Sequence, residues 1–169
     1  MKSYGNEKMT TLIQEAINIG AHGSMWHHKM MLWAQSRGLQ GHKRLNRWES
    51  KCDRDHYIKM QNYCIDMFGE VIEPDWDYII SVPDDIKSYL EAYLDWEDGV
   101  YAQLSAISND LIVAGFPCEA ELVREDLPRK EIEKVRRMLV EYSLSGWDMP
   151  YILLKDRELH NYIKEKEEK

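Results

Sequence analysis

Apolar residues recur at helical spacing along four long segments of the chain, and the polar breaks between them mark where helices end. The first segment, residues 7–36, places apolar side chains three and four positions apart, which predicts a helix with one buried face. Two glycines within residues 37–41 end this helix. The second helix is expected over residues 42–68, with Gly69 as the residue that closes its C-terminus.

The second half of the chain repeats this pattern after a segment of a different kind. Residues 70–83 contain two prolines and the aromatic, β-branched run WDYIISV, and they are too many for a tight turn between antiparallel helices. Three further helices are expected: from the Pro83-Asp84-Asp85 start to about Val113, from about Cys118 to Ser143 with Pro128 as a kink or restart, and a short last helix from about Tyr151.

Two helical hairpins joined by one long crossover predict an all-α four-helix bundle, to which the last segment adds a short fifth C-terminal helix. The 169 residues match the length of one domain, so we expect a single domain over residues 1–169. Other all-α bundles with the same number of helices share this periodicity, which therefore leaves the type of bundle open.

Composition and charge narrow the classes of function. The formal net charge is −8, from 22 basic and 30 acidic residues, which disfavours a protein that holds nucleic acid on a basic face. No stretch approaches the roughly 18 apolar residues that span a membrane. The three cysteines form no CxxC pair, and the chain begins without an apolar signal core, so we expect free thiols in a cytoplasmic protein.

Acidic residues and a histidine interrupt the apolar stripes where the core is expected. Glu49 and His56 lie on the inner stripe of the second helix, and Asp53 shares their face through its spacing of four and three residues. Glu97 lies within the stripe of the third helix, and Glu131 borders the inner face of the fourth. Buried acids are normally paired or bound to a cation. Carboxylates and a histidine from several facing helices are the ligands of di-iron and di-manganese sites.

The alternative interpretation is purely structural. An acid on a helix stripe can reach solvent at the edge of the core, and a histidine on an apolar face can be hydrogen-bonded within it. The acids and the histidine would then pair with cationic neighbours such as Arg54, Lys59 or Arg136, and the bundle would serve structure or interaction without a metal. The combined pattern of a DxxH motif on one helix and an acid on each of two others shifts the balance toward metal.

Four segments of the chain, taken in order, resemble the bacterial non-haem ferritins. The segment KCDRDHYIKM, residues 51–60, is similar to their second-helix ExxH motif, with Asp53 in place of the bridging glutamate and His56 retained. The segment YLEAYLDWEDGV, residues 89–100, is similar to their third helix, whose ligand glutamate falls on Glu97.

The resemblance continues to the C-terminal part of the chain. The segment KEIEKVRRML, residues 130–139, resembles the fourth helix of these ferritins, and the ligand glutamate of that helix falls on Glu131. The segment SGWDMPYILLKDREL, residues 145–159, is similar to the start of their short fifth helix. Each segment alone is a weak signal, and their agreement in order is more specific.

This resemblance implies a ferritin-like protein that binds iron, with manganese or zinc as alternative ions. It further implies oxidation of Fe(II) by oxygen or peroxide, as in a ferroxidase, and iron storage in a homo-oligomeric cage. The residues to which it assigns catalysis are Asp53, His56 and Glu97. The metal ligands expected from it and from the inner helix faces are Asp53, His56, Glu97, Glu131, Glu49 and His27.

The chain also departs from the ferritin pattern. The first-helix ligand glutamate falls on Gly20, which cannot ligate, the nearby tyrosine falls on His27, and a fourth-helix glutamine falls on Pro128. We expect His27, on the same face as Gly20, to stand in for the lost carboxylate, and a degenerate, inactive site is the alternative. Lys134 stands where a second ExxH motif would place its histidine, which disfavours a di-iron oxidase of organic substrates and a bacterioferritin-like site.

Overall fold

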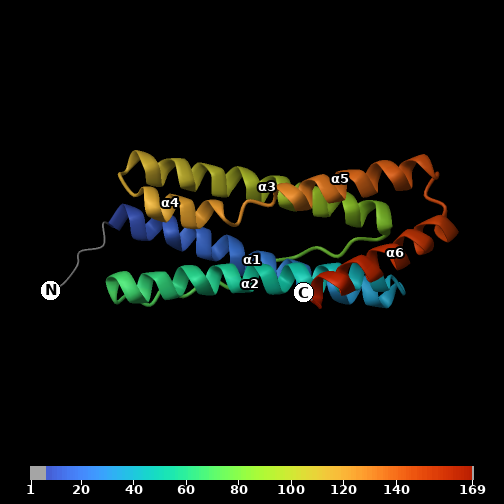
Figure 1. Ribbon diagram of the computed structural model, residues 1–169, viewed down its shortest axis with the longest axis horizontal. Helices are drawn as coiled ribbons and strands as arrows, with labels where there is room; N and C mark the ends of the chain where they lie inside the picture. The colour runs from blue at the N-terminus through green and yellow to red at the C-terminus, as the bar shows by residue number, and fades with distance from the viewer. Residues whose placement is uncertain (1–6, 169) are drawn as a thin grey trace.

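A computed structural model of the protein describes residues 7–168, which form six helices joined by turns and one long crossover (Figure 1). The helices are α1 (Glu7–Ser36), α2 (Gln40–Phe68), α3 (Ile86–Val113), α4 (Pro117–Arg124), α5 (Arg129–Leu144) and α6 (Met149–Glu167). Helix α1 packs along α2, α3 packs along α4 and α5, and α6 folds back onto α2. No helix in this range is both long and apolar enough to cross a bilayer.

The ends of the long helices follow local sequence chemistry. Helix α1 has the bounds expected from its apolar spacing, and α2 begins two residues earlier than expected. Gly69 closes α2 with φ = 70°, a left-handed conformation that glycine adopts without strain. Helix α3 begins with a capping box, in which the Ser88 N–H donates to Asp85 Oδ1 at 2.7 Å and Ser88 Oγ accepts from the Asp85 N–H at 3.0 Å.

The crossover between α2 and α3 runs along the bundle without helix or strand over residues 69–85. Helix α1 holds the crossover against the bundle through side-chain hydrogen bonds. Gln14, Lys29 and Trp33 donate to crossover carbonyls at 2.8, 2.7 and 2.7 Å. The expected long connection between two helical hairpins is confirmed.

The fourth helix is interrupted, in agreement with the restart expected at Pro128. Helix α4 ends at Arg124, and α5 begins at Arg129 directly after the proline, whose ring and missing N–H do not suit a helix interior. Helix α6 is 19 residues long, and its Asp156 carboxylate accepts hydrogen bonds from the Gly41 and His42 N–H groups at 2.9 and 2.8 Å. This contact caps the first turn of α2 and docks the C-terminal helix.

The core consists of two hydrophobic clusters, one toward each end of the bundle. The first is rich in aromatic residues and includes Trp26, Trp33, Tyr89, Tyr93 and Tyr142. The second is mainly aliphatic and includes Met9, Ile13, Ile17, Leu104 and Leu111. On α2, the mainly polar run from Glu49 to His56 separates the residues of the first cluster from those of the second.

Candidate metal centre

Four polar residues from three helices form a group inside the bundle, and we refer to them as the central cluster. They are His27 on α1, Glu49 and Asp53 on α2, and Glu97 on α3. His27, Glu49 and Glu97 are buried, with exposed fractions of 1%, 6% and 4%, and Asp53 is partly buried. Because buried charges are costly unless paired, the three carboxylates of the central cluster need positive charge close by.

The orientation of the His27 ring is fixed by Asn46 on α2. The Asn46 amide nitrogen donates to the His42 carbonyl at 2.8 Å and to the Tyr89 hydroxyl at 2.7 Å. A carbonyl oxygen can only accept, so the amide oxygen of Asn46 is the atom that faces His27 Nδ1, at 3.1 Å. His27 Nδ1 therefore carries a proton and donates it to Asn46.

The other ring nitrogen of His27 faces two carboxylates. His27 Nε2 lies 3.3 Å from Glu97 Oε1 and 3.7 Å from Asp53 Oδ2. Burial lowers the pKa of His27, but the hydrogen bond with Glu97 and the nearby negative charges outweigh burial and raise the pKa to about 9. Burial also raises the pKa of the Asp53 and Glu97 carboxyls. Asp53 Oδ2 is enclosed and has no hydrogen-bond partner among the described residues.

Two glycines on α1 bring the first helix close to α2 at this level. A Cβ atom on Gly23 would lie 2.5 Å from Asp53 Oδ2, so the glycine leaves the space that this carboxylate occupies. A Cβ atom on Gly20 would lie 3.1 Å from Tyr57 Cβ. The position where the ferritin pattern expects a first-helix glutamate is thus closely packed against α2, and His27 is the α1 side chain that reaches the central cluster.

Glu49 pairs with a cationic side chain on α5. Lys134 Nζ on α5 donates to Glu49 Oε1 at 3.0 Å, and both side chains are largely buried. Glu131, one turn earlier on α5, is partly buried, and its side chain makes no hydrogen bond or ion pair with another described residue. The negative charges of Glu49 and Glu131 both raise the pKa of Glu97, although less than burial does.

His56 is placed differently from His27. Its Nδ1 atom contacts Asp126, in the connection between α4 and α5, and its side chain is 35% exposed. The hydrogen bond that His56 donates to Asp126 raises the pKa of His56, and burial raises the pKa of Asp126. The structure therefore brings His27, Asp53 and Glu97 together and places His56 against a different acid.

The cationic partners suggested for a metal-free bundle are not the ones that the central cluster uses. Lys59 contacts the exposed Glu125, and Arg136 pairs with Asp98 at 3.0 Å on the surface. Arg54 is exposed and lines a hollow on the outer face of α1 and α2. The cations that meet the buried acids are instead His27 and Lys134.

Sequence reasoning missed the roles of three polar residues. Asn46 lies three residues before Glu49, which places both residues on the same helix face. This spacing was the one signal in the sequence that Asn46 contacts the central cluster. The sequence identified Lys134 only as the residue that stands where a second ExxH motif would have its histidine. Asp126 had no signal, because it lies in a helix break whose course depends on tertiary packing.

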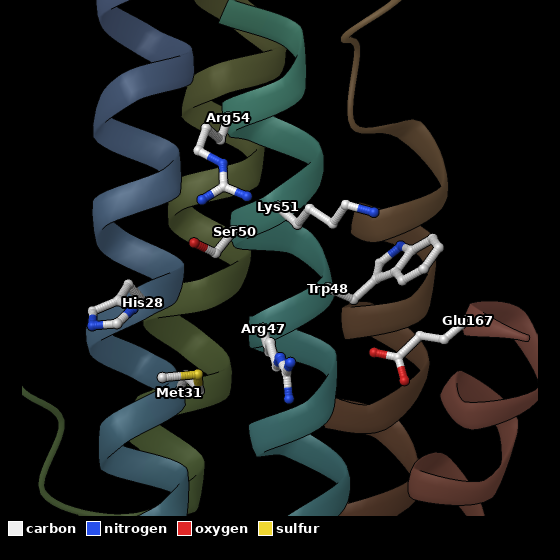
Figure 2. Close-up of a pocket in the computed structure, with 8 residues that line it drawn as sticks. All are labelled: His28, Met31, Arg47, Trp48, Ser50, Lys51, Arg54 and Glu167. Atoms are coloured by element: carbon white, nitrogen blue, oxygen red, sulfur yellow. The ribbon is translucent and has the colours of Figure 1, made fainter. Parts of the chain in front are cut away.

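A hollow on the outer side of α1 and α2 is lined by residues outside the central cluster (Figure 2). It has a volume of about 530 Å³ and lies on the outer side of α1 and α2 beside the end of α6. Its lining residues are His28, Met31, Arg47, Trp48, Ser50, Lys51, Arg54 and Glu167, and none of them belongs to the central cluster.

The donor chemistry of the central cluster fits a divalent cation. Within residues 7–168, no set of three or more His, Cys, Asp and Glu side chains is placed so that it could hold a metal ion. His27 Nε2 and two carboxylate oxygens nevertheless converge, and one of these oxygens, Asp53 Oδ2, is enclosed without a hydrogen bond. One imidazole with carboxylates is a donor set suited to iron, manganese and zinc.

Comparison with known proteins gives matches in structure but none in sequence. No family model and no curated protein matches the chain. The structure is similar to that of an open-pore ferritin from the hyperthermophilic archaeon Archaeoglobus fulgidus, with a TM-score of 0.82 and 18% identity over 95% of this chain and 98% of that chain. The fold is ferritin-like. An engineered closed form of the A. fulgidus ferritin matches with a TM-score of 0.79 and 19% identity, over 92% of this chain and 96% of that one.

The ferritin-like fold confirms the expected architecture of helices and crossover. A humanized archaeal ferritin also matches, with a TM-score of 0.80 and 19% identity over 92% of this chain and 97% of that one. The solved ferritins named here are archaeal or derived from archaeal ferritins, so the closer sequence resemblance to bacterial ferritins stays a prediction. Similarity at this level of identity establishes the fold, and the argument for function rests on the central cluster.

Proposed function

We propose that the protein binds Fe(II) as its substrate at His27, Asp53 and Glu97, and that it oxidises and stores iron as part of a homo-oligomeric ferritin-like cage. The observation that carries this proposal is the orientation of His27. Asn46 holds Nδ1 as a donor, so the nitrogen left to face a cation is Nε2, which lies beside the buried Glu97 carboxylate and the partly buried Asp53 carboxylate. Histidines that bind metals usually donate their other N–H to an oxygen in this way.

The charges of the three side chains also suit a divalent cation. Two ionised carboxylates and a neutral imidazole balance a charge of +2, and the cation replaces the proton that His27 otherwise holds between Glu97 and Asp53. It would also give Asp53 Oδ2 the partner that this oxygen lacks. When bound, Fe(II) supplies one electron per ion to oxygen or peroxide, and the surrounding apolar clusters limit access of water.

Self-association is supported by apolar side chains on the surface. The crossover exposes Val71, Ile79 and Val82, with exposed fractions of 70%, 91% and 57%. Apolar side chains that project from one extended segment are typical of surfaces buried between subunits. Light scattering or native mass spectrometry would test this part of the proposal, and a monomer would contradict it.

A metal-free structural role is the second candidate, and one observation favours it. Three buried or partly buried acids each have a cationic partner within the protein: Glu49 has Lys134, Glu97 has His27, and Asp126 has His56. Such pairing stabilises the bundle without a metal ion, provided that all three partners carry their protons.

Anaerobic calorimetric titration with Fe(II) distinguishes the iron-binding function from the metal-free structural role. We expect the parent protein to bind Fe(II), and Asp53→Asn and Glu97→Gln to weaken binding by more than about tenfold, because each removes a ligand charge. Asp55→Asn is the matched control, since Asp55 is an exposed acid two residues from Asp53 on the same helix. Absence of binding in the parent would favour the metal-free role, and an equal loss in the Asp55 variant would show that Fe(II) is not bound specifically at Asp53.

A further inference from the structure

The hollow on the outer face of α1 and α2 differs in charge from the chain as a whole. Its lining includes Arg47, Lys51 and Arg54 on α2 (Figure 2). All three side chains are exposed, and their charged groups make no hydrogen bond or ion pair with another described residue. The acid in the lining, Glu167, already accepts a hydrogen bond from Arg44 at 2.7 Å. The hollow therefore presents uncompensated positive charge in a chain whose net charge is −8.

The spacing of these cations favours an anionic partner. Lys51 follows Arg47 by four residues and precedes Arg54 by three, so the three side chains leave α2 on one face, where like charges repel one another. Trp48 and Met31, both partly buried, add apolar surface to the same hollow. Acidic groups next to an aromatic side chain would match both the charge and the apolar part of this lining.

The crossover presents such a group at residues 75–77, which we call the acidic segment. It consists of Asp75, Trp76 and Asp77, all exposed, and the exposed fraction of Trp76 is 51%. Neither aspartate makes an ion pair with another described residue. The whole crossover, residues 69–85, contains no Lys or Arg. Its negative charge therefore has no compensation from the crossover itself.

Contacts with α1 and α2 fix the acidic segment in place. The Asp75 carbonyl accepts a hydrogen bond from His22 Nε2 at 2.6 Å, and Asp75 Oδ1 accepts from the Asp77 N–H at 2.9 Å. The Trp76 ring packs edge to face against Tyr57, with 6.2 Å between the ring centroids. Trp76 is thus positioned before any partner binds, and tryptophan and arginine are the residues that contribute most to protein interfaces.

The acidic segment and the hollow lie near each other along α2. Tyr57, which Trp76 contacts, is three residues beyond Arg54 and seven beyond Ser50, and both of these residues line the hollow. Seven residues of helix correspond to a rise of roughly 10 Å. A two-fold axis in the plane of contact, midway between the two features, would place the acidic segment of each copy over the hollow of the other.

We propose that the hollow receives the acidic segment of a second copy of this chain, with Trp76 in the hollow and the two aspartates paired with its three cations. This inference rests on the self-association in the proposed function, and it names the surfaces that meet. The same contact is made twice across the two-fold axis, so each pairing of charges counts twice in the stability of the assembly.

The test is an exchange of charge between the two surfaces. Sedimentation velocity over a series of protein concentrations gives the concentration at which half of the chains are assembled. We expect Arg54→Asp and Asp77→Arg each to raise this concentration by about 30-fold or more, because each brings like charges together. A variant with both changes should return to within about fivefold of the parent, because the two charges are again opposite.

Controls place the same changes of charge elsewhere on the molecule. Lys130→Asp and Asp95→Arg alter exposed residues on α5 and α3 that make no ion pair with another described residue, and each should shift half-assembly by less than about threefold. Trp76→Ala, which leaves the charge unchanged, should weaken assembly by about 30-fold or more. Helical circular dichroism checks that every variant is folded.

The outcomes separate this inference from the proposed function. A monomeric parent overturns the self-association in the proposed function and this inference with it. An assembled parent that neither Arg54→Asp nor Asp77→Arg weakens overturns this inference alone, and so does a combined variant that stays as weak as the single ones. A loss in Arg54→Asp without one in Asp77→Arg would indicate a small anion in the hollow and would also overturn it, as would equal losses in the controls.

Discussion

His27 and His56 both contact carboxylates, but the two histidines stand in different surroundings. His27 is 1% exposed, and it meets Asn46 through one ring nitrogen and Glu97 through the other. His56 has a side chain that is 35% exposed, and it contacts Asp126 in a connection between helices. The motif in the sequence draws attention to His56, whereas burial and ring orientation favour His27 as the metal ligand.

The comparison teaches that the direction of the ring nitrogens matters more than the spacing of a motif. His27 has one nitrogen committed to an amide oxygen, so its second nitrogen is the one left to face the acids of the central cluster. His56 directs its Nδ1 atom to Asp126, an acid outside the central cluster. Four predictions test this difference.

The largest expected effect is the loss of metal affinity on removal of His27, measured against removal of His56. His27→Ala should weaken Zn(II) or Fe(II) binding by about 100-fold or more, a larger loss than the 10- to 100-fold that outer partners of a ligand cost. His56→Ala should weaken binding only a few-fold. Calorimetric titration measures both, with helical circular dichroism as the check on folding. A larger loss in the His56 variant would reverse the assignment.

Removing the partner that orients His27 should have the next largest effect. Asn46→Leu keeps the side chain close in size but removes the oxygen that holds Nδ1 as a donor. We expect metal affinity to fall by about 10- to 100-fold, as for other outer partners of a ligand. The same titration measures this loss. An unchanged affinity would show that Asn46 does not fix the ring.

Metal binding should weaken as the pH falls. The pKa of His27 is raised to about 9, so at neutral pH the ring is protonated and a metal ion must displace that proton. The apparent affinity should fall about tenfold for each pH unit below about 9 and level off above it. Titrations from pH 6.5 to 9.5 test this, and a flat profile would mean that the metal binds elsewhere.

The smallest effect is expected from changing the partner of His56. Asp126→Asn removes the carboxylate whose hydrogen bond raises the pKa of His56, so this pKa should fall toward the 6.5 of an unperturbed histidine. Metal affinity should change less than about threefold, because Asp126 makes no hydrogen bond or ion pair with His27, Asp53 or Glu97 among the described residues and acts on Asp53 only through its charge. NMR titration gives the pKa and calorimetry the affinity. A tenfold loss of metal affinity would indicate that His56 and Asp126 belong to the metal site.

The sequence predicts most of the fold because the relevant signals are local. The bounds of α1 follow from the spacing of its apolar residues, and the end of α2 follows from the conformation that Gly69 can adopt. Pro128 breaks the fourth helix for an equally local reason, its lack of an N–H group.

The site is less predictable because it depends on which helix faces meet. The sequence predicts that acids lie on inner faces and that His27 can replace the residue lost at Gly20, and the structure places His27 beside Asp53 and Glu97. It does not predict that Lys134 reaches Glu49 from α5, because that contact depends on the rotation of α5 in the bundle.

The most direct test of the central claim is ¹⁵N NMR of the histidine rings during titration with Zn(II). We predict that the Nε2 resonance of His27 moves to the range of a metal-bound nitrogen, that Nδ1 of His27 keeps its proton and its bond to Asn46, and that the resonances of His56 stay in place. Movement of the His56 resonances with an unchanged His27 ring, or no change in either ring, would contradict the assignment of His27 as the metal ligand.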